Sequence, residues 1–241
     1  MVLLVFTMPA HKNFSKTSVV EGEVFLIDKP LNWTSFEVVK KLRYILKKKF
    51  NLKDLKVGHA GTLDPLASGL LILCTGRMTK KISAFQNLDK EYIGTMSLGS
   101  TTPSYDLETK IDKTFSINHI TENLLNTVKN KFLGTISQFP PIFSAVKKNG
   151  KRLYKYAREG KNVDIISKKV IINKFCLKRI YIPEIDFEVN CSKGTYIRSL
   201  INDFGKELNS GAHLTSLKRT RIGWFSIDDS ITIDEFIKNL E

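Results

Sequence analysis

Strand-like and helical patterns occur together along this chain of 241 residues, and no internal repeat or low-complexity linker separates them. The apolar runs Val24–Ile27 and Leu70–Cys74 are typical of buried strands. Phe187, Val189 and Cys191 alternate with polar residues, as in a half-buried strand. This mixture predicts an α+β, or mixed α/β, fold in one domain that is large enough to bury a substantial core.

Two helices are predicted from apolar residues at helical spacing. The first follows Thr34, which forms a capping-box pattern with Glu37. Its apolar residues are Phe36, Val39, Leu42, Ile45 and Leu46. The second follows the strand near Cys191 and is closed by Gly211. Its apolar residues are Ile197, Leu200, Ile201, Phe204 and Leu208. The lysines of the first helix lie mostly off its apolar stripe, and such a basic face supports nucleic-acid binding only where it lies beside a site.

The chain carries a large positive charge. Its 38 Lys and Arg residues exceed its 24 Asp and Glu residues, which gives a formal net charge of +14. A field of this sign concentrates polyanions such as nucleic acid near the surface. A lysine-rich composition that serves only solubility is the alternative, and charge alone does not name the partner.

The cysteines and the N-terminal residues argue against several classes of protein. Cys74, Cys176 and Cys191 are far apart and have no second Cys or His at metal-ligand spacing, so we expect neither a zinc site nor a disulfide framework. The apolar run at residues 1–8 is short and lacks the basic leader of a signal peptide. We therefore expect a cytoplasmic protein without membrane contact, in which residues 1–20 form a poorly ordered extension and residues 21–241 form the domain.

A basic hairpin is predicted around Asn149-Gly150, because this dipeptide favours a two-residue type I′ turn between residues 145–148 and 151–154. Seven cationic residues and two tyrosines lie near the turn, against the single acid Glu159. The cations are Lys147, Lys148, Lys151, Arg152, Lys155, Arg158 and Lys161, and the tyrosines are Tyr154 and Tyr156. Such a hairpin suits the clamping of RNA. An exposed hairpin that is kept soluble by its charge is the alternative.

One acidic residue lies in a loop-forming segment. Residues 57–71 contain three glycines and Pro65 around Asp64. By local chemistry, an Asp before a Pro is more often an N-cap or turn residue than a nucleophile, and the spacing leaves the choice open. Farther along, Tyr196 and Arg198 lie at a strand-to-helix junction, where side chains project from a rigid scaffold into a cleft.

The segment around Asp64 is similar to the signature of the bacterial tRNA pseudouridine-55 synthases, the TruB family. The family pattern reads Gly-His-Thr-Gly-Thr-Leu-Asp-Pro-Leu-Ala-Thr-Gly-Leu-Leu, and this chain has Gly58-His59-Ala60-Gly61-Thr62-Leu63-Asp64-Pro65-Leu66-Ala67-Ser68-Gly69-Leu70-Leu71. Further segments resemble family motifs in the family's order, and the resemblance spans about residues 22–225. They are Phe25–Pro30, Asp89–Tyr92, Pro140-Pro141, Ser144–Lys147 and Cys191–Arg198.

The resemblance implies a pseudouridine synthase fold, in which helices flank a central mixed, largely antiparallel sheet and a basic hairpin-helix arm extends over about residues 139–165. It implies an isomerase that converts uridine-55 in the T-loop of tRNA to pseudouridine without a metal or organic cofactor. Asp64 would be the nucleophile of a covalent mechanism. Arg198 would pair with Asp64 and keep it ionised, and Tyr92 would stack on the uracil and serve as a base towards the sugar.

The resemblance also implies a set of substrate-binding residues. His59 would occupy the space that the extruded base leaves in the stack. Tyr196 would pack beside the same pocket, and Lys29 and Pro30 would support the pocket behind Tyr92. The arm residues expected to contact RNA are Lys147, Lys148, Lys151, Arg152 and Tyr154.

Two features depart from the family pattern. Pro103-Ser104 stands where the pattern has Asp-Thr, which leaves the RNA contacts there open. The chain ends at residue 241, so we expect no C-terminal domain of the PUA type.

Three functions remain to be weighed. They are a stand-alone tRNA enzyme acting as a monomer on the T-arm stem-loop, the catalytic subunit of a guide-RNA complex, and a non-catalytic RNA-binding protein or chaperone. Residues 65–69 resemble the stand-alone form, since guide-dependent relatives have Pro-Lys-Val-Thr-Gly there. The retention of Asp64, Tyr92 and Arg198 favours an active enzyme over a chaperone.

Overall fold

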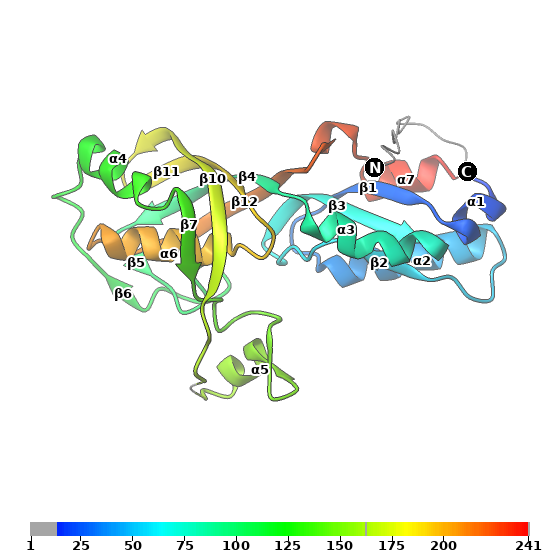
Figure 1. Ribbon diagram of the computed structural model, residues 1–241, viewed down its shortest axis with the longest axis horizontal. Helices are drawn as coiled ribbons and strands as arrows, with labels where there is room; N and C mark the ends of the chain where they lie inside the picture. Colours follow the sequence, from blue (N-terminus) through cyan, green and yellow to red (C-terminus); the bar gives the residue numbers. More distant parts are fainter. Residues whose placement is uncertain (1–13, 162, 241) are drawn as a thin grey trace. The chain divides into compact units, whose positions relative to one another are not determined.

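A computed structural model describes residues 14–161 and 163–240. The fold is mixed α/β with a largely antiparallel sheet, as the sequence predicts (Figure 1). The chain divides into two compact units: unit 1 comprises the described residues up to Leu88 and from Arg219 onward, and unit 2 comprises Asp89–Lys218. Among the helices that the structure describes, none is both long enough and apolar enough to cross a membrane.

Unit 1 is built around two antiparallel strands. β1 (Val24–Lys29) pairs with β3 (Ala67–Thr75), and β2 (Val57–His59) also pairs with β3. Both buried strands predicted from the apolar runs are confirmed. The other elements that lie wholly in unit 1 are α1 (Lys16–Glu21), α2 (Ser35–Lys49), η1 (Gly76–Lys81), α3 (Ile82–Asn87), β13 (Phe225–Ser226), η2 (Ile227–Asp229) and α7 (Ile233–Lys238).

Both faces of β1 and β3 are buried, which explains why their sequences are apolar almost without interruption. Ile27 and Leu71 belong to a core cluster that includes residues of α2 and α7. Leu26 and Leu70, which point to the opposite face, belong to a second cluster that includes Phe85 of α3. The strands are therefore enclosed, and the loops at their ends extend from a fixed base.

The helix α2 begins as predicted and buries Val39, Leu42 and Leu46 as expected, but one predicted core residue is exposed. Thr34 and Glu37 form the expected capping box. Phe36, which we placed on the buried stripe, is 63% exposed, and Val38 is buried in its place. Because residues of a helix are separated by about 100° around its axis, Phe36 lies roughly 200° from Val38 and faces away from the core.

The N-terminal extension expected at residues 1–20 differs from the structure over residues 14–20. Ser15 caps the helix α1 through a capping box with Ser18, and Val19 is fully buried. Phe14 packs edge-on against Phe25, with ring centroids 4.7 Å apart. This end of the segment is ordered because it adds apolar side chains to the core of unit 1, whereas residues 1–13 lie outside the described residues.

Unit 2 contains an antiparallel sheet covered by the helix α6 (Ile197–Glu207). Phe204 of α6 packs against Phe175 of the sheet, with ring centroids 5.7 Å apart. The strands, in spatial order, are β4 (Lys90–Leu98), β11 (Glu184–Cys191), β10 (Lys168–Tyr181) and β7 (Gly134–Gln138). The smaller elements are β5 (Ser100–Thr101), β6 (Lys113–Thr114) and α4 (Glu122–Asn130). The chain returns to unit 1 within β12 (Ala212–Ile222).

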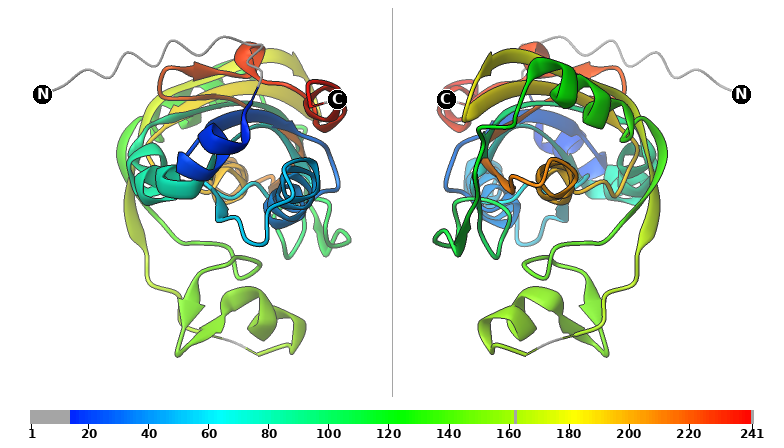
Figure 2. Two further views of the ribbon diagram at one scale, coloured as in Figure 1. Left: turned by 90° about the vertical axis from the view of Figure 1, so that its right-hand side faces the viewer. Right: turned by 90° about the vertical axis from the view of Figure 1, so that its left-hand side faces the viewer.

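A hairpin and a short helix project from the ends of β7 and β10, as Figures 1 and 2 show; we call residues 139–165 the arm. Asn149 and Gly150 have φ angles of 50° and 78°, as a type I′ turn requires, so the predicted hairpin is confirmed. Its strands β8 (Lys147–Lys148) and β9 (Lys151–Arg152) are shorter than expected, because the helix α5 (Leu153–Arg158) begins directly after β9.

Candidate active site

Asp64 lies in the loop between β2 and β3 of unit 1; we call residues 60–66 the Asp64 loop. The loop leaves the sheet at Ala60, whose amide donates a 2.9 Å hydrogen bond to the carbonyl of Ile72. The carbonyl of Asp64 accepts a 3.1 Å hydrogen bond from the amide of Ala67, which closes a turn. Asp64 and Pro65 therefore form a turn, as local chemistry suggests. The side chain of Asp64 is half-buried.

The backbone is fixed on both sides of Asp64. Ser35, the buried first residue of α2, accepts a 2.9 Å hydrogen bond from the amide of Leu63 and donates one of 3.1 Å to the Leu63 carbonyl. The amide of Asn32 donates a 2.8 Å hydrogen bond to the carbonyl of Pro65. The start of α2 thus holds the residues immediately before and after Asp64.

Arg219 of β12 joins the start of the same loop to β3, the strand that follows it. Its side chain is fully buried, its Nε donates to the carbonyl of Leu70 at 2.8 Å, and one terminal nitrogen donates to the carbonyl of Gly61 at 3.1 Å. Gly69 is required there, because a Cβ at this position would lie 2.3 Å from the Arg219 carbonyl oxygen. Nothing in the local sequence distinguishes Arg219 from the other cations of β12, and the sequence prediction did not include it.

Lys29, at the end of β1, places a buried cation within the electrostatic reach of Asp64. Its amino group donates hydrogen bonds to the carbonyls of Pro30 and Trp33. Burial lowers the pKa of Lys29 to about 8, and the negative charge of Asp64 opposes this shift. The predicted support of the Tyr92 pocket by Lys29 and Pro30 joins residues of different units and stays a prediction.

His59 lies at the end of β2, and its burial favours the neutral form of the imidazole. Burial lowers its pKa below the ordinary value, the backbone of Gly61 opposes the shift, and the cation of Arg219 adds to it. The ring is half-buried. A planar, uncharged ring is suited to an RNA stack, and its position one residue before the Asp64 loop makes it part of the same anchored segment.

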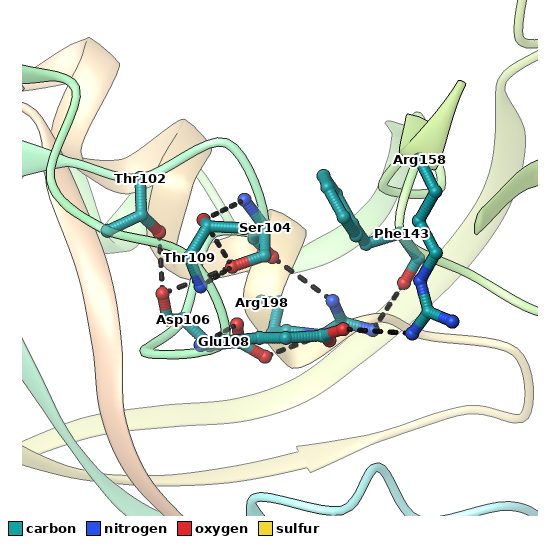
Figure 3. A network of polar contacts seen from close by, with 8 residues as sticks. All are labelled: Thr102, Ser104, Asp106, Glu108, Thr109, Phe143, Arg158 and Arg198. Atoms are coloured by element: carbon teal, nitrogen blue, oxygen red, sulfur yellow. Dashed lines mark hydrogen bonds and ion pairs between the residues drawn. The ribbon is translucent and has the colours of Figure 1, made fainter. Parts of the chain in front are cut away.

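In unit 2, Arg198 holds together two segments that are distant in sequence (Figure 3). The guanidinium lies 3.5 Å from the carboxylate of Asp106, donates to the Ser104 carbonyl at 3.1 Å, and donates to the Phe143 carbonyl at 2.9 Å. Arg198 and Asp106 are both buried. One side chain therefore connects the segment 102–109 to the base of the arm.

The segment 102–109 is closed by its own hydrogen bonds, in which Ser104 is central. The Ser104 hydroxyl bonds to Thr109 Oγ1 at 2.8 Å, and the carbonyl of Asp106 accepts from Thr102 Oγ1 at 2.7 Å. One oxygen of the Asp106 carboxylate accepts from the amide of Glu108. Ser104 stands where the family pattern has Thr, and either residue supplies a hydroxyl. Asp106 was not among the predicted site residues, because only its contact with the distant Arg198 reveals it.

The two predicted tyrosines lie at ordered positions of unit 2. Tyr92 is buried in β4, opposite Val189 of β11. Tyr196 precedes α6, and its backbone amide and carbonyl both bond to the side chain of the buried Gln138, at 2.8 and 3.1 Å. Ser199, one turn into α6, donates a 2.8 Å hydrogen bond to the Phe139 carbonyl. The start of α6 consequently fixes the base of the arm.

The arm cations fall into two groups. Lys151 pairs with Glu159, and Lys148 donates to the carbonyl of Asp164. Lys147 and Arg152 are exposed, and neither forms an ion pair with any residue that the structure describes. Tyr154 lies under a cation of the arm itself, with the guanidinium of Arg158 5.3 Å from its ring centroid.

The structure thus gathers part of the predicted site within each unit. His59, Lys29 and Pro30 lie around the Asp64 loop of unit 1, whereas Arg198 and Tyr196 lie together at the base of the arm in unit 2. The pairing of Asp64 with Arg198 and the position of Tyr92 relative to Asp64 join the two units and stay predictions.

Comparisons with known proteins show the family to which the chain belongs. Residues 47–197 match the model of the TruB family pseudouridylate synthase N-terminal domain, and residues 198–241 match that of the tRNA pseudouridylate synthase B C-terminal domain. The chain is 57% identical to the tRNA pseudouridine synthase B of Flavobacterium johnsoniae, over 92% of this chain and 97% of that protein. It is 53% identical to that of Phocaeicola vulgatus, over 90% and 92%. The chain therefore belongs to the TruB family of pseudouridylate synthases.

Solved structures with a similar fold include chains of larger assemblies. A chain in the crystal structure of a Cbf5-Nop10-Gar1 complex superposes with a TM-score of 0.69 and 30% identity, over 96% of this chain and 56% of the other. A chain of an H/ACA RNP bound to a substrate RNA superposes with a TM-score of 0.65 and 28% identity, over 91% and 53%. This protein spans just over half the length of those solved chains.

Proposed function

We propose that this protein isomerises uridine-55 in the T-loop of tRNA to pseudouridine, with Asp64 as the nucleophile. The observation that carries the proposal is the Asp64 loop, which has the family signature and is anchored by Ser35 and Asn32 on either side of the acid. Holding a nucleophile in one geometry removes much of the entropic cost of reaching the transition state. The relatives named tRNA pseudouridine synthase B match nearly the whole chain, which supports tRNA as the substrate.

The reaction exchanges one bond to the ribose for another. The N1–C1′ bond of the uridine breaks, the uracil turns, a C5–C1′ bond forms, C5 loses its proton and N1 gains one. A covalent intermediate on the carboxylate of Asp64 divides this exchange into two easier steps. We assign to Arg198 the pairing that keeps Asp64 ionised and aimed, and to Tyr92 the stacking on the uracil and the role of base.

The target base has to leave its stack before it reaches the carboxylate. We assign His59 to the vacated position, where an uncharged ring stacks on the neighbouring bases. Tyr196 lines the pocket, and Lys29 and Pro30 support it. The cations of the arm and Tyr154 hold the stem-loop. The protein acts in the cytoplasm as a monomer. It needs no guide RNA, since residues 65–69 carry the stand-alone sequence.

The test is pseudouridine formation in an unmodified T-arm stem-loop incubated with purified protein. We expect product with the wild type and none with Asp64→Asn, while the variant keeps its affinity for the RNA. Asp54→Asn is the matched control, because Asp54 is an exposed acid of unit 1 that caps only the amide of Leu55. RNA binding without product in the wild type would support a non-catalytic protein, and a requirement for added guide RNA would support the subunit of a complex.

A further inference from the structure

A hollow of about 360 Å³ lies on unit 1 beside the start of α2. Two of its lining residues are aromatic and two are cationic. The lining residues are Asn32, Trp33, Glu37, Lys40, Lys41 and Tyr44. Nothing in the proposed mechanism uses this hollow.

Helical spacing brings these side chains to one face. Glu37, Lys41 and Tyr44 follow at intervals of four and three residues, so they lie above one another on the exposed side of α2. The buried side is formed by other positions, among them Val38 and Leu42. Tyr44 is 63% exposed, and its ring is therefore available for contact with a ligand.

Glu37 lies within electrostatic reach of Lys40, but two lysines against one acid leave the lining of the hollow with a net positive charge. Among the residues that the structure describes, Lys40 and Lys41 have no acidic partner within ion-pair distance. Glu37, the one acid of the hollow, already accepts hydrogen bonds from the amide and hydroxyl of Thr34. Some surface lysines elsewhere do form ion pairs, as Lys174 does with Glu188 at 2.6 Å.

The hollow adjoins the Asp64 loop. Asn32 lines the hollow, and its own amide bonds to the carbonyl of Pro65, next to the nucleophile. Ser35, between Trp33 and Glu37 in sequence, holds Leu63 on the other side of Asp64. An RNA that brings a nucleotide to Asp64 consequently has neighbouring nucleotides close to α2.

We propose that this hollow binds a nucleotide of the substrate RNA next to the target uridine, with the base stacked on Tyr44 and the phosphate on Lys40 and Lys41. An exposed aromatic ring beside cations without an ion-pair partner is the combination that binds unpaired nucleotides, because every base has a face that stacks and every linkage carries a negative charge. The choice of RNA as the ligand rests on the proposed function.

The test compares Tyr44→Ala and the double variant Lys40→Gln/Lys41→Gln with the wild type, using an unmodified T-arm stem-loop. Tyr44→Ala is expected to raise KM and the dissociation constant roughly tenfold with kcat unchanged, as for the loss of one stacked base. The double variant is expected to weaken binding and to lower the slope of log K against log salt by about one to two. Melting temperatures should not change, because the altered side chains are exposed.

The matched control is Lys47→Gln/Lys48→Gln, which removes the same charge from the same helix outside the hollow. The proposal is wrong if this control and the Lys40/Lys41 variant weaken binding equally, or if Tyr44→Ala leaves KM unchanged. Absence of pseudouridine formation in the wild type would instead contradict the proposed function. In that case the dissociation constants of the variants still decide whether the hollow binds RNA.

Discussion

The Asp64 loop and the arm hold their polar groups in opposite ways. In the loop, buried side chains bind backbone carbonyls and amides: Ser35 holds Leu63, and Arg219 holds Gly61 of the loop and Leu70 of the following strand. In the arm, exposed side chains bind one another, as Lys151 does Glu159. Buried hydrogen bonds fix a geometry, whereas exposed ion pairs contribute little stability and are exchanged easily for pairs with a ligand. The difference suits a fixed nucleophile and an adaptable contact with RNA.

The largest effect is expected from Arg219→Met. This change removes the donor from the buried carbonyl of Leu70, at a cost of roughly 1–3 kcal/mol, and from the half-buried carbonyl of Gly61, at a smaller cost. We expect kcat to fall about a hundredfold or more, since small misplacements of a nucleophile are costly, while RNA affinity changes little. Steady-state kinetics and urea unfolding measure the two effects. Arg219→Lys keeps the positive charge but loses the separate N–H donors of the guanidinium. Compared with Arg219→Met, it should recover more of the unfolding free energy than of kcat.

If the folded Arg219→Met protein keeps the wild-type kcat, the geometry of the Asp64 loop does not depend on Arg219. The contrast between a fixed loop and an adaptable arm would then be wrong.

The next largest effect is expected from Asp106→Asn. The amide keeps the shape of the side chain but removes the negative charge that faces Arg198, so this contact is weakened and the guanidinium is held less firmly. We expect kcat to fall about tenfold to a hundredfold with the dissociation constant for the stem-loop nearly unchanged. Single-turnover assays and binding titrations separate these outcomes.

Asp112→Asn is the matched control, since Asp112 is exposed and its hydrogen bonds join it to Thr101 of β5. If kcat falls equally in both variants, the loss comes from the removal of a negative charge in this region and not from the contact between Asp106 and Arg198.

The difference between the two regions also explains what the sequence could predict. The capping box of α2 and the turn at Asn149-Gly150 depend on residues a few positions apart, and both are confirmed. The anchoring roles of Arg219 and Asp106 depend on contacts with distant parts of the chain, so no local pattern indicates them. The exposure of Phe36 was mispredicted because helical spacing alone did not decide which of several overlapping apolar stripes faces the core.

A smaller effect is expected in the arm, where the structure divides the predicted cations into two pairs. Lys147→Gln/Arg152→Gln removes exposed charges without partners in the arm, and Lys148→Gln/Lys151→Gln removes charges already paired. We expect the first variant to weaken RNA binding roughly tenfold and to lower the slope of log K against log salt by about one to two. The second variant is expected to change both quantities less. Binding titrations at several salt concentrations measure both. Identical losses would show that the arm's ion pairs do not reduce its attraction for RNA.

The smallest effect concerns stability, and it follows from the buried cation of the loop region. The pKa of Lys29 is about 8 in the folded protein against 10.5 for the ordinary side chain, so the unfolded chain binds this proton more tightly. The charged form therefore costs stability below pH 8, and this cost is relieved as the pH rises from 8 towards 10.5. Relative to Lys29→Met, which has no such group, the wild type should gain about 1.5 kcal/mol of unfolding free energy between pH 8 and 9.5. Urea unfolding at both pH values measures it, with Lys147→Gln as a control that should follow the wild type. If the difference in unfolding free energy between the wild type and Lys29→Met is the same at both pH values, the amine of Lys29 is in contact with water. The polar groups near the Asp64 loop would then be exposed, as those of the arm are.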